Sequence, residues 1–305
     1  MNTIEKALEK LRQSSGQLSN KVAATPAKAA GASATTPDPS GNNASAQRTA
    51  EAVPANGVAK NSHRMVLDLA RLEKMGFLTP ESGRSQLAEE MRHIKRPLLL
   101  NAFGDHVDFG SNNLNLIMVT SSRPGEGKTY TSLNLAMSIA KERDKTVLLV
   151  DADVAKPGVT RVLNMESAKG LVDYLLDDAL SIPDVMMRTN VPNLRFIPAG
   201  KRHIHSTELL TSENMKQLTE ELATRYPDRV VIFDSPPLLA TSEASVVAEL
   251  VGQIVMVVEA EQTSSDEVRE ALSLIAENKI LGLILNKARG SFGTDYYGYY
   301  GKYGE

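Results

Sequence analysis

One short segment, SSRPGEGKT at 121–129, most constrains the fold of this chain. It lies between an apolar run at 116–119 and a helical pattern at 132–140. A strand, a glycine-containing turn and Gly-Lys-Thr at the start of a helix are the parts of a phosphate-binding loop. Gly125 and Gly127 let the backbone curl so that successive N–H groups point inward at phosphate oxygens, and the helix that follows adds its positive N-terminal end. The segment therefore predicts a nucleotide-binding α/β domain.

The side chains around these glycines complete the predicted site. Lys128 can reach the β- and γ-phosphates as a mobile positive charge, and the Thr129 hydroxyl can ligate Mg²⁺. The usual pattern has a glycine five residues before Gly127, where this chain has Ser122, which is small enough for the turn. ATP and Mg²⁺ are therefore the predicted cofactors. The predicted nucleotide contacts are Ser122, Pro124, Gly125, Glu126, Gly127, Lys128, Thr129, Tyr130 and Asn286.

The composition narrows the class of protein. The 305 residues carry a net charge of −3, which gives no basic bias toward nucleic acid, and they include no cysteine. Disulfides, thiolate zinc sites and cysteine nucleophiles are excluded, and a reducing cytoplasmic location is allowed. No apolar run approaches the ~20 residues that span a bilayer, and the charged N-terminus is unlike a signal peptide. We expect a cytoplasmic protein that meets the inner membrane peripherally or through a partner.

Before the phosphate loop, the amino-acid composition of the chain changes twice. Ile4, Ala7, Leu8 and Leu11 share one face of a short amphipathic helix at 2–13, which is either a frayed end or a docking element. The following segment is rich in Ala, Ser, Thr and Pro without aromatic residues, which predicts a disordered linker. The predicted division is a helix at 1–13, a linker at 14–60, a helical lead-in at 61–114, a nucleotide-binding core at 115–290 and a tail at 291–305.

The lead-in is predicted to contain helices at 64–75 and 83–95. In the second helix Glu89, Arg92 and Lys95 recur every three residues and so line one side. From the spacing alone, this row is a solvated, salt-bridging face.

From residue 115 onward, strand and helix patterns alternate. The apolar runs lack clean alternation of polar and apolar residues, as expected of strands buried on both faces. This order is typical of a doubly wound, mostly parallel sheet with helices on both faces, whose ligands bind at the carboxyl ends of the strands. Strands are predicted at 115–120, 146–151, 194–198, 230–234, 253–259 and 282–286, and helices at 129–142, 168–177, 206–225, 241–250 and 264–278.

Three carboxylates end strands at the same predicted edge. Asp151 and Asp153 in VLLVDAD are two residues apart in extended chain and so point the same way. They could hold metal-bound water or accept a proton from an attacking hydroxyl. Asp234 ends the run VVIFD, a Walker B pattern that predicts an Mg²⁺ ligand. Each of the three could instead cap its own loop.

Asn286 follows the last predicted strand. Its amide could hydrogen-bond a purine edge or cap the loop. His203 and His205 have no carboxylate or cysteine constellation around them, so no metal site is predicted there.

The C-terminal tail contains clustered tyrosines separated by glycines, which disfavour a packed helix or strand. The tail is predicted to be flexible, and its phenolic hydroxyls are candidate substrates for a neighbouring active site. The alternative is a stacking tail for RNA or glycan. The five tyrosines are Tyr296, Tyr297, Tyr299, Tyr300 and Tyr303.

Taken together, the PGEGKT loop, the DxD segment followed by a basic residue and Pro, the hhhDSPP segment and the Tyr-Gly tail resemble the bacterial tyrosine kinases. The similarity covers residues ~80–305. The N-terminal MNTIEKALEKL and the linker resemble the exopolysaccharide-associated tyrosine autokinases found with XrtA-type exosortases. The similarity implies an ATP-dependent autokinase that controls the chain length and export of an exopolysaccharide.

The resemblance also implies roles for individual residues. Lys128 and Thr129 would bind phosphates and Mg²⁺, Asp151 would act as the base toward tyrosine, and Asp153 and Asp234 would ligate metal. The tail tyrosines would be phosphorylated in trans by a neighbouring subunit. Glu89 and Arg92 match a family ExxRxxR motif that builds a ring of subunits, with Lys95 in the third place and Arg96 beside it, and Lys156 stands where arginine is usual. The implied activating partner is the cytosolic segment of a membrane chain-length regulator.

Two alternatives share the same fold. A partition-type switch ATPase usually carries a lysine early in the loop, where this chain has Arg123 followed by Pro124, and it has no need of a Tyr-Gly tail. A scaffold with a degenerate loop is disfavoured because the lysine, the threonine and all three carboxylates are present. Fold alone does not separate these activities.

Overall fold

The computed structural model describes residues 63–104, 113–203 and 206–288, all within the compact unit Gly57–Glu305. The predicted N-terminal helix at 2–13, the linker at 14–60 and the tyrosine tail lie outside the described residues. The predicted domain boundaries therefore stay predictions.

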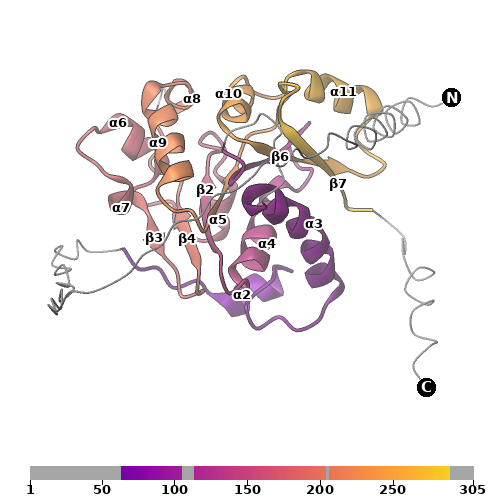
Figure 1. Cartoon of the computed structure of the whole chain (residues 1–305), viewed down its shortest axis with the longest axis horizontal. Coiled ribbons are helices and arrows are strands. Elements are labelled where there is room, and N and C mark those ends of the chain that lie inside the picture. Colours follow the sequence, from indigo (N-terminus) through magenta and orange to yellow (C-terminus); the bar gives the residue numbers. More distant parts are fainter. Residues whose placement is uncertain (1–62, 105–112, 204–205, 289–305) are drawn as a thin grey trace, which may run out of the picture. The chain divides into compact units, whose positions relative to one another are not determined.

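The centre of the described part is one seven-stranded sheet in the order β3-β4-β2-β5-β1-β6-β7 (Figure 1). Every pairing is parallel except that of β3 with β4. The predicted doubly wound, mostly parallel architecture is confirmed. The strands are β1 (Leu116–Ser121), β2 (Thr146–Asp151), β3 (Met187–Arg188), β4 (Leu194–Ile197), β5 (Arg229–Asp234), β6 (Gln253–Glu259) and β7 (Ile280–Asn286).

The strand order places a switch point at β1. The chain passes from β1 to β2 on one side of the sheet and returns later to β6 on the other side, with β5 inserted between β1 and β2. In such sheets the carboxyl end of the strand at the switch point opens into a crevice that binds ligands. The register pairs Val119 of β1 and Asp151 of β2 with Asp234 of β5, so the ends of the three strands meet at one level.

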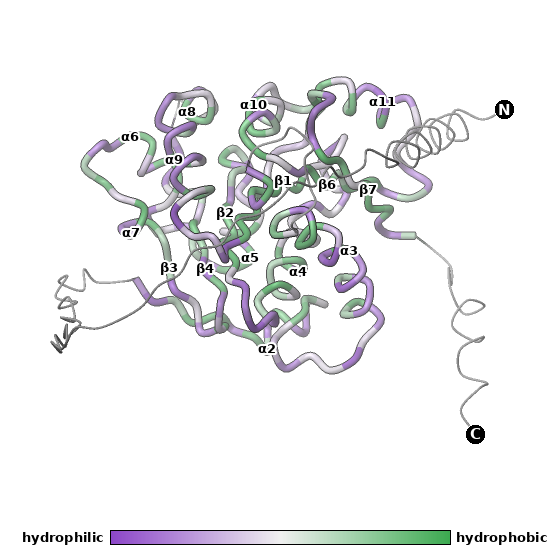
Figure 2. The backbone as a smooth tube through the Cα atoms, viewed as in Figure 1, coloured by the Kyte–Doolittle hydropathy of each residue, from purple (hydrophilic) through white to green (hydrophobic). Residues whose placement is uncertain are grey.

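Two layers of helices cover the sheet, each around its own buried cluster of apolar side chains. Ile117 and Val119 of β1 face one cluster, and Leu116 and Met118 face the other. Figure 2 shows the hydrophobic residues concentrated along the central strands and the hydrophilic ones on the outer helices. The first layer holds α2 (Leu69–Lys74), α3 (Gln86–Phe103), α4 (Lys128–Ala140) and α5 (Gly158–Val162); the second holds α6 (Leu171–Leu176), α7 (Ile182–Val185), α8 (Ser206–Leu209), α9 (Glu213–Thr224), α10 (Glu243–Leu250) and α11 (Ser265–Ser273).

The lead-in differs most from its prediction. Helix α2 begins only at Leu69 and is capped by the Asp68 side chain. The preceding residues are not helical because they run beside β3, where the Met65 N–H donates to the Arg188 carbonyl (2.9 Å). Helix α3 continues eight residues beyond the predicted end and includes Pro97. Burial of its apolar stripe in the first cluster, where α3 packs on α4, offsets the hydrogen bond that proline cannot make.

Smaller differences concern short elements. The helix predicted at 206–225 is divided into α8 and α9, because the Ser212 hydroxyl accepts from the Met215 N–H (3.3 Å) and starts a new helix. The sequence patterns did not predict β3, α5 or α7, which have only two to five residues each. Within the described part of the chain, no helix has the length and apolar character needed to cross a membrane.

Candidate nucleotide-binding site

The phosphate loop joins β1 to α4 and has the conformation that its glycines permit. Gly125 and Gly127 have φ values of +94° and +103°, in the left-handed region that side chains rarely adopt. Gly127 is the N-cap of α4, and no side chain in the described ranges caps this end of the helix. The first N–H groups of α4 are therefore left for a ligand, which is the arrangement that binds anions at helix N-termini.

Lys128 lies at the start of α4 and is held by a carboxylate from the next strand. Its Nζ donates to Oδ2 of Asp153 at 2.8 Å. Burial disfavours the charged ammonium, but the carboxylates of Asp234 and Asp153 more than offset this effect, so the pKa of Lys128 is raised. Lys128 is thus a permanent cation beside the loop. Asp153 also caps its own turn, since its Oδ1 accepts from the Lys156 N–H (3.0 Å); its predicted role toward metal stays a prediction.

Asp234 is fully buried and joins α4 to the end of β5. Its Oδ2 accepts from the Thr129 hydroxyl (2.8 Å), and its Oδ1 lies 2.9 Å from the Ser132 hydroxyl. Burial raises the pKa of Asp234 to about 6, against the opposing effect of the nearby Lys128 charge. The carboxylate is therefore more than a loop cap, because both of its oxygens face helix α4.

Asp151 lies beside Asp234 and is also fully buried. Its Oδ2 accepts from the Thr160 N–H at 2.7 Å, while its Oδ1 has no hydrogen-bond partner among the described residues. Burial raises the pKa of Asp151 to about 8, and the neighbouring Asp234 carboxylate adds to the effect. An unpaired buried carboxylate oxygen is costly, so this atom is available for a ligand that the site is built to receive.

The oxygen atoms gathered here fit Mg²⁺. The Thr129 hydroxyl and the carboxylates of Asp153 and Asp234 are hard donors of the kind this ion prefers, and the free Oδ1 of Asp151 lies beside them. Among the described residues, no group of three or more His, Asp or Glu side chains is arranged to hold a metal by itself.

Two predicted nucleotide contacts have side chains that point elsewhere. The Tyr130 hydroxyl donates to the Gly76 carbonyl (2.9 Å), and its ring packs against Phe77 of the lead-in with centroids 5.2 Å apart. Tyr130 therefore anchors α4 to the lead-in. The Asn286 side-chain amide donates to the Glu126 carbonyl (2.8 Å), so its amino group contacts the loop, and the predicted contact of Asn286 with a purine stays a prediction.

The remaining residues of the phosphate loop differ in how deeply they are buried. Pro124 is exposed, and Ser122 is buried with an unpaired hydroxyl. The Glu126 carboxylate turns away from the helix terminus: its Oε2 accepts from the Arg123 N–H (2.7 Å), and its Oε1 accepts from the Glu259 N–H (3.3 Å). Only the backbone of Glu126 is left for phosphate.

Some residues of the site were missed by sequence reasoning. Ser132 lies one turn beyond Thr129 on the same face of α4, which is a detectable i, i+3 signal. Thr160 orients Asp151 from α5, and its hydroxyl also accepts from the Ala199 N–H (3.0 Å). No motif marks Thr160, because its role depends on a tertiary contact with β2.

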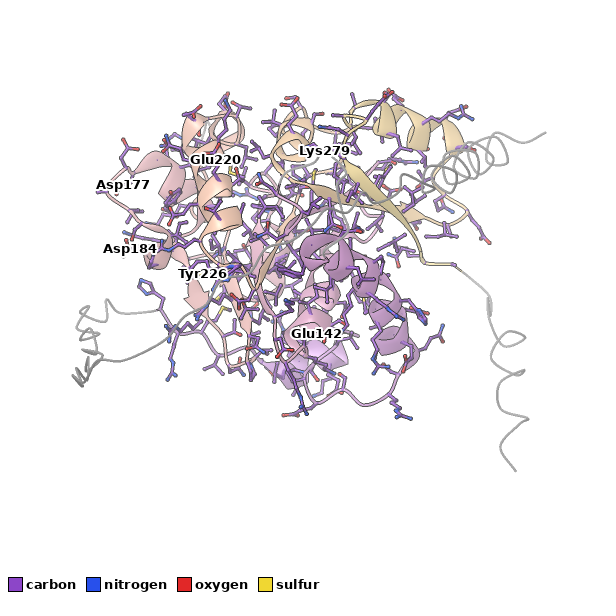
Figure 3. The ribbon with its side chains drawn as sticks, viewed as in Figure 1. Glu142, Asp177, Asp184, Glu220, Tyr226 and Lys279 are labelled. Atoms are coloured by element: carbon purple, nitrogen blue, oxygen red, sulfur yellow. The ribbon has the colours of Figure 1, made fainter. Side chains whose placement is uncertain are left out.

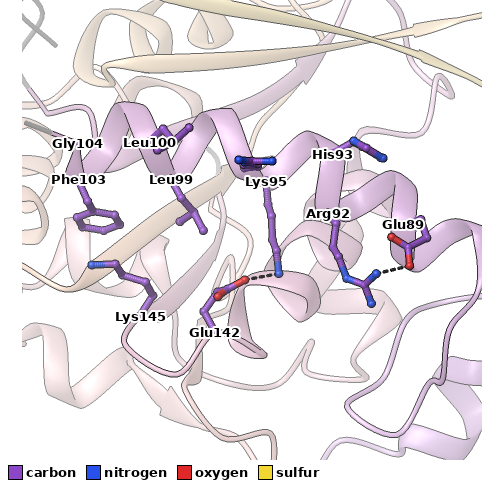
Figure 4. A pocket seen from close by; sticks show the side chains of 11 residues that line it. Glu89, Arg92, His93, Lys95, Leu99, Leu100, Phe103, Gly104, Glu142 and Lys145 are labelled. Carbon is purple, nitrogen blue, oxygen red and sulfur yellow. Dashed lines mark hydrogen bonds and ion pairs between the residues drawn. The ribbon is translucent and has the colours of Figure 1, made fainter. Parts of the chain in front are cut away.

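The predicted oligomerisation row lies on α3, away from the loop, beside a groove of about 630 Å³ (Figure 4). Glu89 and Arg92 form an exposed ion pair, as in the figure. Lys95 departs from the row, because its side chain is buried and its Nζ donates to the Ser138 carbonyl (2.8 Å) and pairs with Glu142 (2.6 Å). The prediction that Lys95 continues the exposed row is wrong.

Known proteins resemble this chain over the described core. The AAA domain family matches residues 114–280. The tyrosine-protein kinase YwqD of Bacillus subtilis is 34% identical over 200 residues, which are 64% of this chain and 82% of YwqD. The tyrosine-protein kinase CpsD of Streptococcus agalactiae is 33% identical over 208 residues, 67% of this chain and 88% of CpsD. The crystal structure of the VpsO kinase domain superposes with a TM-score of 0.54 at 30% identity, covering 67% of this chain and all of that domain.

Proposed function

This chain belongs to the bacterial tyrosine kinase family, and from that premise we propose that it phosphorylates the tyrosines of its own C-terminal tail. It is a protein-tyrosine kinase with a nucleotide-binding P-loop domain. The observation that best supports the autokinase is the meeting of Lys128, Thr129 and three carboxylates at the carboxyl ends of β1, β2 and β5. One sheet edge thus combines a phosphate cradle, a fixed cation and a candidate base.

In the proposed reaction, the N–H groups of the loop bind the phosphates and Lys128 stabilises the charge that develops on the transferred phosphoryl group. The tyrosine oxygen attacks the γ-phosphorus, the bond from that phosphorus to the β,γ-bridging oxygen breaks, and ADP leaves. The phenolic proton passes to Oδ1 of Asp151, the carboxylate oxygen that no described residue contacts by a hydrogen bond. Mg²⁺, when bound by Thr129 and Asp234 with Asp153 nearby, would neutralise phosphate charge.

Asp151 accepts a proton only when it is ionised. Its pKa of about 8 in the unliganded protein means that the carboxyl is largely protonated at neutral pH. Activity is therefore expected to rise with pH toward and through the pKa that Asp151 has in the complex with ATP.

The acceptors proposed are Tyr296, Tyr297, Tyr299, Tyr300 and Tyr303, phosphorylated in trans within a ring-like homo-oligomer. We further propose that the activating partner is the cytosolic segment of a membrane chain-length regulator. Such a partner would hold the kinase at the inner membrane and couple tail phosphorylation to exopolysaccharide length and export. These assignments rest on the family resemblance and on the tyrosine-rich tail.

The loop argues against the switch-ATPase alternative. Arg123, at the place of the lysine usual in partition-type proteins, forms an ion pair with Glu267 of the same chain (3.3 Å). The residue at this place is thus an arginine that pairs within its own chain, not the lysine usual in partition-type proteins.

Mass spectrometry of the tail after incubation with Mg·ATP tests the proposal. We expect phosphotyrosine within 296–303 in the wild type and none in Lys128→Met, because the variant lacks the cation that stabilises the transferred phosphoryl group. Incubation with and without the cytosolic segment of a candidate regulator tests the partner. An unmodified tail despite ATP hydrolysis would contradict the autokinase.

A mixture of two variants separates trans from cis transfer. The first lacks residues 291–305 and so can only donate phosphate; the second is full-length Lys128→Met and can only accept it. Phosphotyrosine on the second chain is the expected result. A Lys128→Met tail that stays unlabelled, beside an active wild type, would exclude transfer between chains.

A further inference from the structure

The carboxyl end of edge strand β7 is attached to the tip of the phosphate loop by two side chains. Asn286 donates its Nδ2 to the Glu126 carbonyl oxygen at 2.8 Å. Lys287, the next residue, donates its Nζ to the Gly125 carbonyl oxygen, also at 2.8 Å. Two adjacent carbonyls of the loop therefore receive hydrogen bonds from two adjacent residues of β7 and its end.

These two carbonyls matter because of how a phosphate loop works. A concave run of backbone N–H groups binds an anion only while the carbonyls of the same peptides point away from it. If a peptide of the loop flips, a carbonyl oxygen replaces an N–H and repels phosphate. A donor on the outer side of the loop opposes that flip.

We propose that Asn286 and Lys287 are positioning residues that hold the phosphate loop in its anion-binding conformation by fixing the Glu126 and Gly125 carbonyls outward. We call this pair the loop clamp. The proposal rests on the nucleotide site described above and adds a function for the end of β7. The clamp contacts the loop and not the reacting atoms, so its expected effect is on binding of the phosphate chain.

The loop clamp is itself held firmly. Lys287 Nζ also pairs with Oε2 of Glu259 at the end of β6 (3.0 Å), which fixes its direction. The backbone of Lys287 has φ +57°, a left-handed conformation that costs a residue with a side chain some energy. Asn286 lies so close to the loop that a Cβ added to Gly127 would be 2.1 Å from its Nδ2. A side chain at position 127 would collide with Asn286, so glycine is required there both for the contacts of the loop clamp and for the turn of the loop.

Glu126 strengthens the attachment from the other direction. Its carboxylate is buried and accepts from the Glu259 N–H at the end of β6 and from the Thr263 hydroxyl in the segment that follows β6. The same residue is therefore fixed through its carbonyl by β7 and through its carboxylate by β6. The loop tip gains its rigidity from the two strands on the far side of β1, which carry none of the predicted catalytic residues.

The clamp can be distinguished from a contact between Asn286 and a purine. A positioning role weakens the binding of any triphosphate, with or without a base. A base contact weakens only nucleotides that carry that base. Inorganic tripolyphosphate has the phosphates alone and so separates the two roles.

The experiment measures how well ATP, GTP and tripolyphosphate displace a fluorescent ATP analogue from the full-length protein. For Asn286→Ala and for Lys287→Ala we expect all three affinities to fall together, by about three- to tenfold, the effect of losing one such hydrogen bond. Lys287→Arg keeps a donor and should recover part of the loss. A loss confined to ATP, with tripolyphosphate unchanged, would overturn the clamp in favour of base recognition.

The chain offers a matched control at the other end of the same strand. Lys279, labelled in Figure 3, precedes β7. It also donates its Nζ to two backbone carbonyls, those of Glu249 and Val251, both at 2.7 Å. Lys279→Ala should leave all three affinities unchanged. An equal loss in this variant would show that β7 acts through general stability, and would reject the positioning role. Wild-type protein that binds no triphosphate would reject the nucleotide site itself, whereas normal binding in both clamp variants would reject only the clamp.

Discussion

The carboxyl edge of the sheet and the exposed side of helix α3 both carry charged residues in recognisable motifs, but the two regions treat those charges in opposite ways. At the sheet edge, Asp151 and Asp234 are buried side by side, and within the part of the chain that the structure describes one oxygen of Asp151 has no partner. On α3, Glu89 and Arg92 form an ion pair in solvent. Burial without full pairing destabilises a fold, whereas an exposed pair contributes little. The difference indicates that the sheet edge is kept for chemistry at a cost in stability.

Asp151→Asn tests this contrast with the largest expected effect. Kinase activity should fall by about 100-fold or more, because the candidate base is lost. The unliganded variant should nevertheless be more stable at neutral pH than the wild type, since a buried group with a raised pKa is replaced by a neutral one. A single variant would then lose activity and gain stability.

The direction in which the Asp151 pKa is shifted determines how the stability of the wild type depends on pH. The pKa of Asp151 rises from 3.8 in the unfolded chain to about 8 in the fold, so the native state binds the extra proton between these values. This contribution to stability is complete below the lower pKa and is lost as pH rises through the upper one. Urea unfolding from pH 5 to 9 should therefore show a flatter profile in Asp151→Asn. Asp177→Asn, a change at an exposed carboxylate (Figure 3), is the control and should leave activity and profile unchanged.

Lys95→Met tests the same comparison between buried and exposed charges within helix α3. Lys95 is the one member of the predicted row that is buried, and it donates to the Ser138 carbonyl near the C-terminal end of α4 while pairing with Glu142. We expect its replacement to lower the free energy of unfolding by about 1–3 kcal/mol. Urea denaturation measures the loss. An unchanged midpoint would mean that Lys95 has no structural role and that its burial is neutral.

The inward position of Lys95 shows where sequence reasoning succeeded and where it failed. The phosphate loop and Asp234 were predictable because strand, turn and helix are local, and because the ends of parallel strands meet at one edge. Lys95 was placed by its three-residue spacing from Arg92 alone. The apolar stripe of Ala88, Met91 and Leu98 puts residue 95 on the buried face of α3, so the signal was present in the sequence.

Other features had no such signal. The extension of α3 across Pro97 contradicts the local preference of proline and depends on packing against α4. Thr160 orients Asp151 from a five-residue helix that no periodicity could reveal. The inward turn of Tyr130 depends on Gly76 and Phe77 in the lead-in. In each case the missing information is a tertiary contact between segments distant in sequence.

The position of Lys95 also redefines the proposed assembly surface. With residue 95 buried, the exposed row on α3 runs from Glu89 through Arg92 to Arg96, both arginines being exposed at the groove. We therefore propose that Arg96 takes the third place in the oligomerisation motif. Arginine there restores the planar, bidentate donor that lysine lacks, so the ring implied by the family does not need Lys95.

Arg92→Ala and Arg96→Ala should have the smallest effects on folding, within about 0.5 kcal/mol, because each change removes a solvent-exposed side chain. Both should nevertheless shift self-association toward the monomer in sedimentation velocity, while Lys95→Met should lower stability without changing the association of the folded fraction. If Lys95→Met dissociates the oligomer and Arg96→Ala does not, the original motif register holds and the third place belongs to residue 95. Stability is predicted to change in Lys95→Met, and self-association in the two arginine variants. Unfolding and sedimentation measurements together therefore distinguish a surface that binds a second subunit from a buried ion pair that stabilises the fold.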